Sequence, residues 1–380
     1  MKHLGVILLL AISACFGSHS YKPVSLDTSN SLIGTSNYIW VDSTRIDPYY
    51  GDYRLINVQV WYPAESSKDF RQAAYIDKIE MLATELEDWS MEDIRTVGEF
   101  TVLGKMDLPL SSEWESYPVL LFSPSLGGLY QYYTHYAESL VKLGFVCVGI
   151  NHLYESEFVL DPSYRVRPAD HTFHDSLESL SIPEQITSDQ FRAMKSLRSE
   201  VLANDMKFCL DMLSQINESE YSGRLNLSRV GAWGHSIGGA AASYASLIDP
   251  RVVAVSNLDG TPPTEVADKG IPVPFMFLED LTDYKNHAGY KKQFDRRELF
   301  CRNGHADAYR ILFDNINHNS FLDIHFRLAR SSNEKQNALN FVNKSCEYLH
   351  SFFQAYLLDQ SFVLEEIRTD TLEIFTFRKT

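Results

Sequence analysis

A serine flanked by glycines stands between a strand pattern and a helix pattern. Residues 234–238 read Gly-His-Ser-Ile-Gly; an apolar run at 229–233 precedes them and small residues at 240–243 follow. A serine on a tight strand-to-helix turn has strained backbone dihedrals, and the two elements can approach only where the residues two before and two after lack side chains. Gly234 and Gly238 meet that demand. The pattern therefore predicts a nucleophile elbow with Ser236 as a nucleophile for carbonyl carbon.

Such a serine needs a base to take its proton and an acid to orient that base. In one common type of serine hydrolase, these residues follow one another along the sequence as serine, acid and histidine. Asp259 closes a strand pattern and is followed by a glycine, which releases the chain into a loop. Asp280 and Asp283 follow the next strand pattern and are the alternatives. We expect Asp259 to be the acid and keep Asp280 and Asp283 as rivals.

Five histidines follow Asp259: His287, His305, His318, His325 and His350. His318 comes just after a strand pattern, at the edge where loop residues can reach the elbow, so we expect it to be the base. His235, next to the serine, is expected to pack under the turn without a catalytic role. His152 is expected to make a structural hydrogen bond, with a place in the pocket as the alternative.

Ester attack also creates an oxyanion, which two backbone N–H groups normally stabilise. One comes from the residue after the nucleophile, here Ile237. The other comes from the loop after an early strand, here residues 123–128. Within that loop we assign the second donor to Leu126.

Apolar strands that alternate with helices run through most of the chain. Strand patterns cover residues 37–42, 53–62, 117–122, 144–150, 229–233, 252–258, 273–278 and 309–313, and helical patterns cover 130–143, 187–215 and 333–358. Continuous apolar strands separated by helices are typical of a mostly parallel sheet with helices on both faces. We expect one α/β domain over 37–358, with insertions near 65–116 and 155–183. The second insertion is either a cap over the site or a surface loop.

The net charge of −16 and the pI near 5.2 argue against nucleic-acid binding, which needs a basic patch. No cysteine or histidine spacing is typical of a metal site, and the chemistry above needs no cofactor. Cys147 and Cys209 are expected to be buried thiols, whereas Cys301 and Cys346 could form a disulfide in an exported protein.

The first 18 residues are typical of a secretory signal, with Lys2 before an apolar stretch. Residues 12–15, Ile-Ser-Ala-Cys, are similar to a bacterial lipobox, in which Cys15 would carry the lipid anchor; simple cleavage near residue 17 or 18 is the alternative. We expect an exported cell-envelope protein that is membrane-anchored through Cys15, or otherwise secreted. Beyond this segment, no apolar run approaches the ~20 residues that span a bilayer.

Several of these motifs, in this order, resemble the plasma-type platelet-activating factor acetylhydrolase family and its bacterial lipoprotein relatives. The resemblance covers about residues 40–350 and rests on residues 61–63, 121–127, 234–239, 258–260 and 318–321. It implies an α/β-hydrolase fold and a calcium-independent serine esterase that cleaves short or oxidised acyl chains from phospholipids. It also implies Ser236 as nucleophile, Asp259 as acid and His318 as base. The family often has His-Gly-Leu where this chain has Pro-Ser-Leu at 124–126, and the two insertions lie where acyl and head-group selectivity would be set.

The leading hypothesis is therefore a serine esterase for short-chain carboxylic esters, including acetyl or oxidised acyl groups of phospholipids, that works through an acyl-enzyme. One alternative is a general carboxylesterase or polyester hydrolase that uses Asp280 or Asp283 as acid. Another is a non-catalytic surface lipoprotein that keeps the fold as a binding module. The sequence leaves the physiological ester and the oligomeric state open.

Overall fold

The computed structural model describes residues 32–48, 50–66, 70–82, 90–182, 184–282, 285, 287–360 and 372–378. This part of the chain is built around one eleven-stranded sheet in the order β13-β12-β11-β10-β9-β5-β6-β2-β1-β4-β3. Its strands are β1 (Leu32–Ile46), β2 (Tyr53–Ala64), β3 (Arg71–Gln72), β4 (Lys105–Met106), β5 (Tyr117–Ser123), β6 (Val146–His152), β9 (Leu225–His235), β10 (Val252–Leu258), β11 (Phe275–Asp280), β12 (Ala308–Phe313) and β13 (Leu372–Phe377). A separate two-stranded hairpin pairs β7 (Phe158–Leu160) with β8 (Val166–Pro168).

The six strands from β6 to β12 are parallel to their neighbours, and antiparallel pairs flank them on both sides. The expected mostly parallel sheet is therefore confirmed. The chain runs from β5 to β6 on one side and then returns to place β9 on the other side of β5. Such a reversal opens a crevice at the carboxyl ends of the strands, where ligands bind in α/β sheets.

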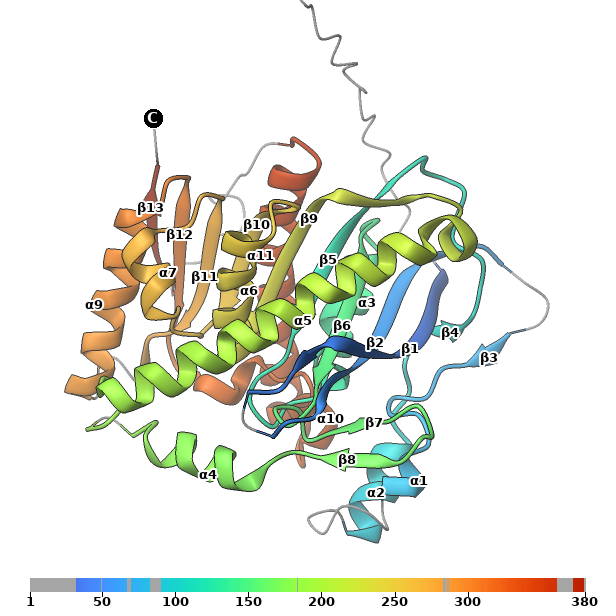
Figure 1. Cartoon of the computed structure of the whole chain (residues 1–380), viewed down its shortest axis with the longest axis horizontal. Coiled ribbons are helices and arrows are strands. Elements are labelled where there is room, and N and C mark those ends of the chain that lie inside the picture. The colour runs from blue at the N-terminus through green and yellow to red at the C-terminus, as the bar shows by residue number, and fades with distance from the viewer. Residues whose placement is uncertain are drawn as a thin grey trace, which may run out of the picture.

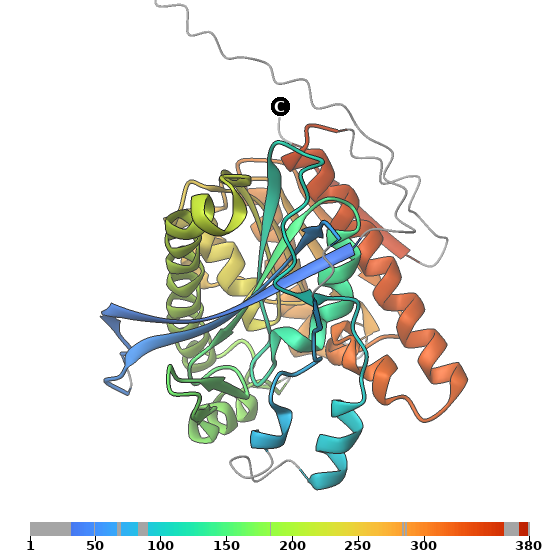
Figure 2. The same ribbon diagram turned by 90° about the vertical axis from the view of Figure 1, so that its right-hand side faces the viewer.

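Helices cover both faces of the sheet (Figure 2). One face carries α5 (Asp189–Tyr221), α6 (Ile237–Ile248), α7 (Thr264–Lys269) and α9 (Ala288–Asn303), and the other carries η2 (Tyr130–Tyr133), α3 (Thr134–Val141), η3 (His318–Phe321) and α11 (Ser332–Leu357). The short helix α10 (Ile324–Leu328) packs in a separate apolar cluster with residues of segment 75–97. Alternate residues of each strand point to opposite faces of the sheet and pack in two separate hydrophobic cores. In β5, Val119 and Leu121 belong to the first core, and Leu120 and Phe122 belong to the second.

The two predicted insertions lie at the periphery of the sheet. Residues 65–116 contain α1 (Ile79–Leu82) and α2 (Met91–Gly98) and add β4 and β3 to the sheet edge beyond β1. Residues 155–183 contain the β7–β8 hairpin and α4 (His171–Ser179), which Figure 1 shows along one end of the sheet together with α10. Within the described residues, no helix is long and apolar enough to cross a membrane.

The disulfide between Cys301 and Cys346, which the sequence left open, is not formed, because both side chains are free and buried. Cys301 lies on α9 in the core of one sheet face, and Cys346 lies on α11 in the core of the other. The sheet separates the two thiols. Cys147 and Cys209 are buried as expected.

Several element boundaries differ from the predicted ones. The predicted helix over 130–143 begins as the 3-10 helix η2 before α3 continues it, and α5 runs on to Tyr221. Strand β11 extends to residue 280, so that Asp280 ends the strand instead of following it. These shifts come from tertiary pairing, which local sequence patterns do not record.

Candidate active site

Ser236 occupies the sharp turn between β9 and α6 with φ 56° and ψ −116°, a conformation that L residues rarely adopt. Its N–H donates to the Leu258 carbonyl at 2.9 Å, which ties the turn to β10. A Cβ on Gly234 would lie 2.4 Å from the carbonyl group of Gly238, and a Cβ on Gly238 would lie 2.1 Å from the carbonyl oxygen of Ser123. Both glycines are therefore required by contact between backbones, as the sequence pattern predicted.

Asp259 follows β10 directly and has φ 53°, with its N–H bonded to the Leu278 carbonyl at 2.9 Å. Its Oδ2 lies 2.6 Å from Nδ1 of His318, the first residue of η3. The carboxylate can only accept, so the Nδ1–H donates and the Nε2 lone pair is left to act as a base. The structure thus brings together the predicted acid and base, which are distant in sequence.

A buried arginine holds the Asp259 carboxylate from the other side. Arg297 of α9 donates to Asp259 Oδ1 at 2.7 Å and to the Asp259 carbonyl at 2.9 Å. The same guanidinium contacts Glu279 at 3.2 Å, and Arg310 donates twice to that glutamate, at 2.6 and 2.8 Å. Burial raises the pKa of Asp259, but the Arg297 charge and then the His318 hydrogen bond lower it more, so the net pKa lies well below its usual range.

The rival acids are not brought to His318 in the same way. The Oδ1 of Asp280 accepts from the Thr282 N–H at 2.7 Å, and the Asp280 N–H points to Asp259 Oδ1 at 3.4 Å. Asp280 therefore caps the chain after β11 and supports the Asp259 carboxylate. Asp283 lies outside the described residues.

His235 packs beneath the turn as expected. Its Nδ1 lies 2.7 Å from the Tyr133 hydroxyl, and its ring packs against the ring of His318 with the centroids 4.7 Å apart and the planes tilted by 41°. Burial, and next the neighbouring His318, lower the pKa of His235 well below its usual value. The neutral ring gives His318 a fixed platform.

His152 makes a structural hydrogen bond and does not line the catalytic pocket. Its Nδ1 lies 2.9 Å from Asp205 Oδ2, its Nε2 lies 2.9 Å from the Ser123 hydroxyl, and it is 1% exposed. Asp205 is held in turn by Arg54, which also binds Asp47. Taking one partner from such a buried ion pair typically costs about 3–5 kcal/mol, so this chain of contacts fixes the end of β5.

The other candidate histidines make contacts elsewhere. His305 lies 3.0 Å from the Lys269 carbonyl, and His287 stands at the amino end of α9 against Tyr290. His350 packs on Phe145, where burial lowers its pKa to about 4. His325 lies within α10.

The two predicted oxyanion donors come from two neighbouring turns of the chain. Ile237 is the first residue of α6, where a helix leaves its N–H groups without intrahelical acceptors. Leu126 lies in the turn after β5, which meets the elbow at the contact between Ser123 and Gly238. Among the described residues, neither amide donates a hydrogen bond. Both N–H groups are therefore available to a ligand.

Ser236, Asp259 and His318 line one pocket of about 260 Å³. Its other lining residues are Ser181, Ile186, Phe191, Lys195, Thr261, Asp280, Tyr290, Gln293 and Arg297. Burial is the main cause that lowers the pKa of Lys195 to about 7, and the charge of Arg297 lowers it further. Sequence reasoning missed Lys195 and Arg297, because both come from helices whose local pattern carries no catalytic signal.

In the described part of the chain, no group of acidic, histidine and cysteine side chains is arranged to hold a metal ion.

Residues 50–330 match the model of the family described as platelet-activating factor acetylhydrolase, isoform II. The chain belongs to this family. Its members are ester hydrolases, so the chain is a carboxylic ester hydrolase of the serine type. The platelet-activating factor acetylhydrolase of Cavia porcellus is 23% identical over 346 residues, which cover 80% of this chain and 73% of that protein.

A solved structure, the ferulic acid esterase from Streptomyces cinnamoneus, matches with a TM-score of 0.71 at 20% identity. The match covers 93% of this chain and 98% of the other. At this identity the likeness speaks for the fold, and it confirms the expected α/β-hydrolase architecture.

Replacing Arg297 with Gln should lower the free energy of unfolding by about 3–5 kcal/mol near neutral pH, because Asp259 loses its buried cation. In the unfolded chain an aspartate titrates near about pH 3.9. Since the folded pKa of Asp259 is lower, the native protein loses this stabilisation as the pH falls below that value. The variant lacks most of this stabilisation at any pH. The difference in free energy of unfolding between wild type and variant, measured by urea unfolding, should therefore be smaller at about pH 3 than at about pH 6.

The matched control is Arg302→Gln, on the same helix, whose exposed pair with Glu298 should contribute at most about 1 kcal/mol. A stability gap for Arg297→Gln that stays the same at both pH values would contradict the assigned charge balance.

Proposed function

We propose that this chain hydrolyses esters through a Ser236–His318–Asp259 triad, with the Leu126 and Ile237 amides as the oxyanion hole. The observation that carries the proposal is the 2.6 Å bond between His318 and Asp259 at the rim of the pocket that also contains Ser236. The strained turn at Ser236 supports it, since strain of this kind is typical of a presented nucleophile.

In the acylation step, His318 Nε2 takes the proton from the Ser236 hydroxyl while the serine oxygen bonds to the ester carbonyl carbon. The carbonyl oxygen gains negative charge and is stabilised by the two amides, a contribution of roughly 3 kcal/mol per donor in such sites. The imidazolium then gives its proton to the departing alcohol, and the acyl group stays on the serine. Water, deprotonated by His318, releases the acid and restores the hydroxyl. The Asp259 carboxylate stabilises the imidazolium in both steps.

For the substrate, we propose a short acyl group, including acetyl or oxidised acyl chains of phospholipids. The pocket volume of about 260 Å³ supports a small acyl group rather than a long unmodified one. Lys195 at the same pocket adds positive charge below about pH 7, which suits an ester with an anionic group nearby.

We further propose that the protein acts at the cell envelope, anchored through Cys15. That cysteine lies outside the described residues, and the proposal rests on the signal-like sequence around it.

Ser236→Ala should reduce turnover of p-nitrophenyl acetate by at least ~10⁴-fold, because the nucleophile is lost. The same variant should no longer be labelled by a fluorophosphonate, whereas Ser228→Ala, an exposed serine on the same strand, should behave as wild type. Unlabelled wild-type protein would instead favour a binding module without catalysis. Equal turnover in Ser236→Ala would overturn the assignment.

Asp259→Asn should lower turnover by about 10⁴-fold, since an amide no longer orients and stabilises the histidine. Asp280→Asn and Asp283→Asn should lower it far less. The three variants are compared by kcat on the same ester, with unfolding curves to show that each is folded. A larger loss in Asp280→Asn or Asp283→Asn would transfer the acid role to that residue.

Along an acyl series from acetyl to dodecanoyl p-nitrophenyl esters, kcat/KM should fall steadily as the chain outgrows the pocket. A phospholipid with an acetyl group should be cleaved with higher kcat/KM than a simple acetyl ester of similar reactivity. Preference for the simple ester would favour a general carboxylesterase, and a flat acyl series would contradict the short-acyl proposal.

A further inference from the structure

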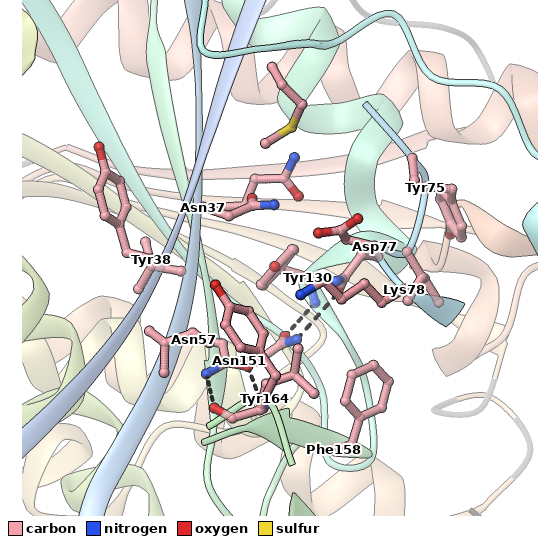
Figure 3. Close-up of a pocket in the computed structure, with 18 of the residues that line it drawn as sticks. Asn37, Tyr38, Asn57, Tyr75, Asp77, Lys78, Tyr130, Asn151, Phe158 and Tyr164 are labelled. Carbon is pink, nitrogen blue, oxygen red and sulfur yellow. Dashed lines mark hydrogen bonds between the residues drawn. The ribbon is translucent and has the colours of Figure 1, made fainter. Parts of the chain in front are cut away.

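A second, larger pocket of about 580 Å³ lies on the antiparallel side of the sheet, away from Ser236. It is bounded by β1, β2, the end of β6, the segment 71–78 and the β7–β8 hairpin (Figure 3). None of its lining residues belongs to the catalytic pocket. Both its size and its separation indicate a site of its own, since ligand pockets are typically about 300–1,000 Å³.

The strands present amide side chains to this pocket through their alternation. Residues 57 and 59 of β2 share a face, and the register places Asn37 opposite Gln59 and Asn57 opposite Asn151. Four amides are thus cross-strand neighbours on one patch of sheet. An α/β sheet normally has an apolar surface there, beneath its helices. Figure 3 shows Asn37, Asn57 and Asn151 on the strand side, with Asp77 and Lys78 across from Asn37.

Two of the amides build the wall of the pocket. Asn57 donates to the Leu160 carbonyl at 2.8 Å and accepts from the Leu160 N–H at 2.6 Å, which fastens the hairpin to β2. Asn151 accepts from the Tyr130 N–H at 2.7 Å and donates to Gln131 at 3.2 Å, which fastens η2. These bonds fix the shape of the pocket before any ligand arrives.

The other two amides are not satisfied by the protein. Gln59 is 7% exposed and lines the pocket, yet its side chain makes no hydrogen bond within the described residues, and neither does that of Asn37. Asn37 is exposed, and within the described residues the polar atoms of Gln59 are not closed off from solvent, so both amides are open to a ligand from the pocket. Each amide offers donors and an acceptor side by side, so a ligand group that pairs with it can both donate and accept.

The charged and aromatic residues that line the pocket restrict the chemical class of ligand further. The charged lining residues are Arg71, Asp77, Lys78 and Asp107, two of each sign, so the pocket has no formal net charge. Two of its aromatic lining residues are Tyr130 and Tyr164. Tyr130 packs edge-on against Trp61, and the Lys78 ammonium lies 3.5 Å from the centre of the Tyr164 ring. A neutral ligand with hydroxyl groups and an apolar face fits this combination.

We propose that this pocket binds a neutral saccharide, with hydroxyls paired to Gln59 and Asn37 and with a sugar C–H face against the Tyr130 or Tyr164 ring. This is a binding function beyond ester hydrolysis and does not depend on the triad. Helix η2 separates the two sites: Tyr130 lines the saccharide pocket, whereas Tyr133 contacts His235 beneath the elbow.

The test is a saturation-transfer NMR titration of the full chain with cellobiose, maltose and lactose. At least one should bind with a Kd of about 1 mM or tighter. Gln59→Met, which keeps the side-chain length but removes the amide, should weaken binding about tenfold, and Asn37→Ala should weaken it as well. Gln336→Met, at an exposed position on α11, is the matched control and should bind as wild type.

Ester turnover should be unchanged in Asn37→Ala and Gln59→Met, and Ser236→Ala should bind the sugar as wild type does; these results separate this proposal from that of the triad. Should Gln59→Met fail to fold, Asn37→Ala alone decides, since Asn37 is exposed and tolerates truncation. Absence of binding by all three sugars at about 10 mM, or equal affinity in wild type and Asn37→Ala, would overturn the proposal.

Discussion

The contact between Gly238 and the carbonyl of Ser123 is the constraint on which the site depends. No side chain fits there, so the first turn of α6 rests directly on the end of β5. That contact places the Ser236 turn, the Ile237 amide and the loop with Leu126 around one point. A single backbone approach thus sets the positions of the proposed nucleophile and the proposed oxyanion donors together.

Two clusters of buried ion pairs hold the residues of the site in place. The Arg297 and Arg310 cluster holds Asp259 beneath His318, and the Arg54 cluster holds Asp205, which positions His152 against the end of β5. In a low-dielectric interior each carboxylate needs a compensating cation. The consequence is rigidity where the chemistry requires fixed geometry, since no member of either cluster can move without exposing its partner's charge.

The parallel sheet and the residues at its strand ends could be predicted from the sequence, because in a parallel sheet every strand ends at the same edge. The carboxyl ends of neighbouring strands meet at one edge, so strand patterns followed by polar residues were enough to predict that Ser236, Asp259 and His318 lie at one pocket. Lys195 and Arg297 reach the site from helices, and their placement depends on how each helix packs on the sheet. Whether Cys301 pairs with Cys346 could not be predicted for a similar reason, since the face on which a helix lies is set by chain crossovers. The alternation of Asn57 and Gln59 predicted a strand, but not that its polar face would line a pocket.

Helix α5 links regions that would otherwise be independent. Its 33 residues span about 50 Å at the usual rise. Near its amino end Lys195 lines the catalytic pocket, and further along Arg198 and Asp205 enter the buried ion cluster. Sliding this helix to enlarge the substrate space would break the ion pairs of Arg198 and Asp205, which lie three and ten residues beyond Lys195. Acyl preference can therefore change more easily through substitutions in the segment just before α5, around Ser181 and Ile186. These residues line the same pocket, and replacing them leaves the position of α5 unchanged.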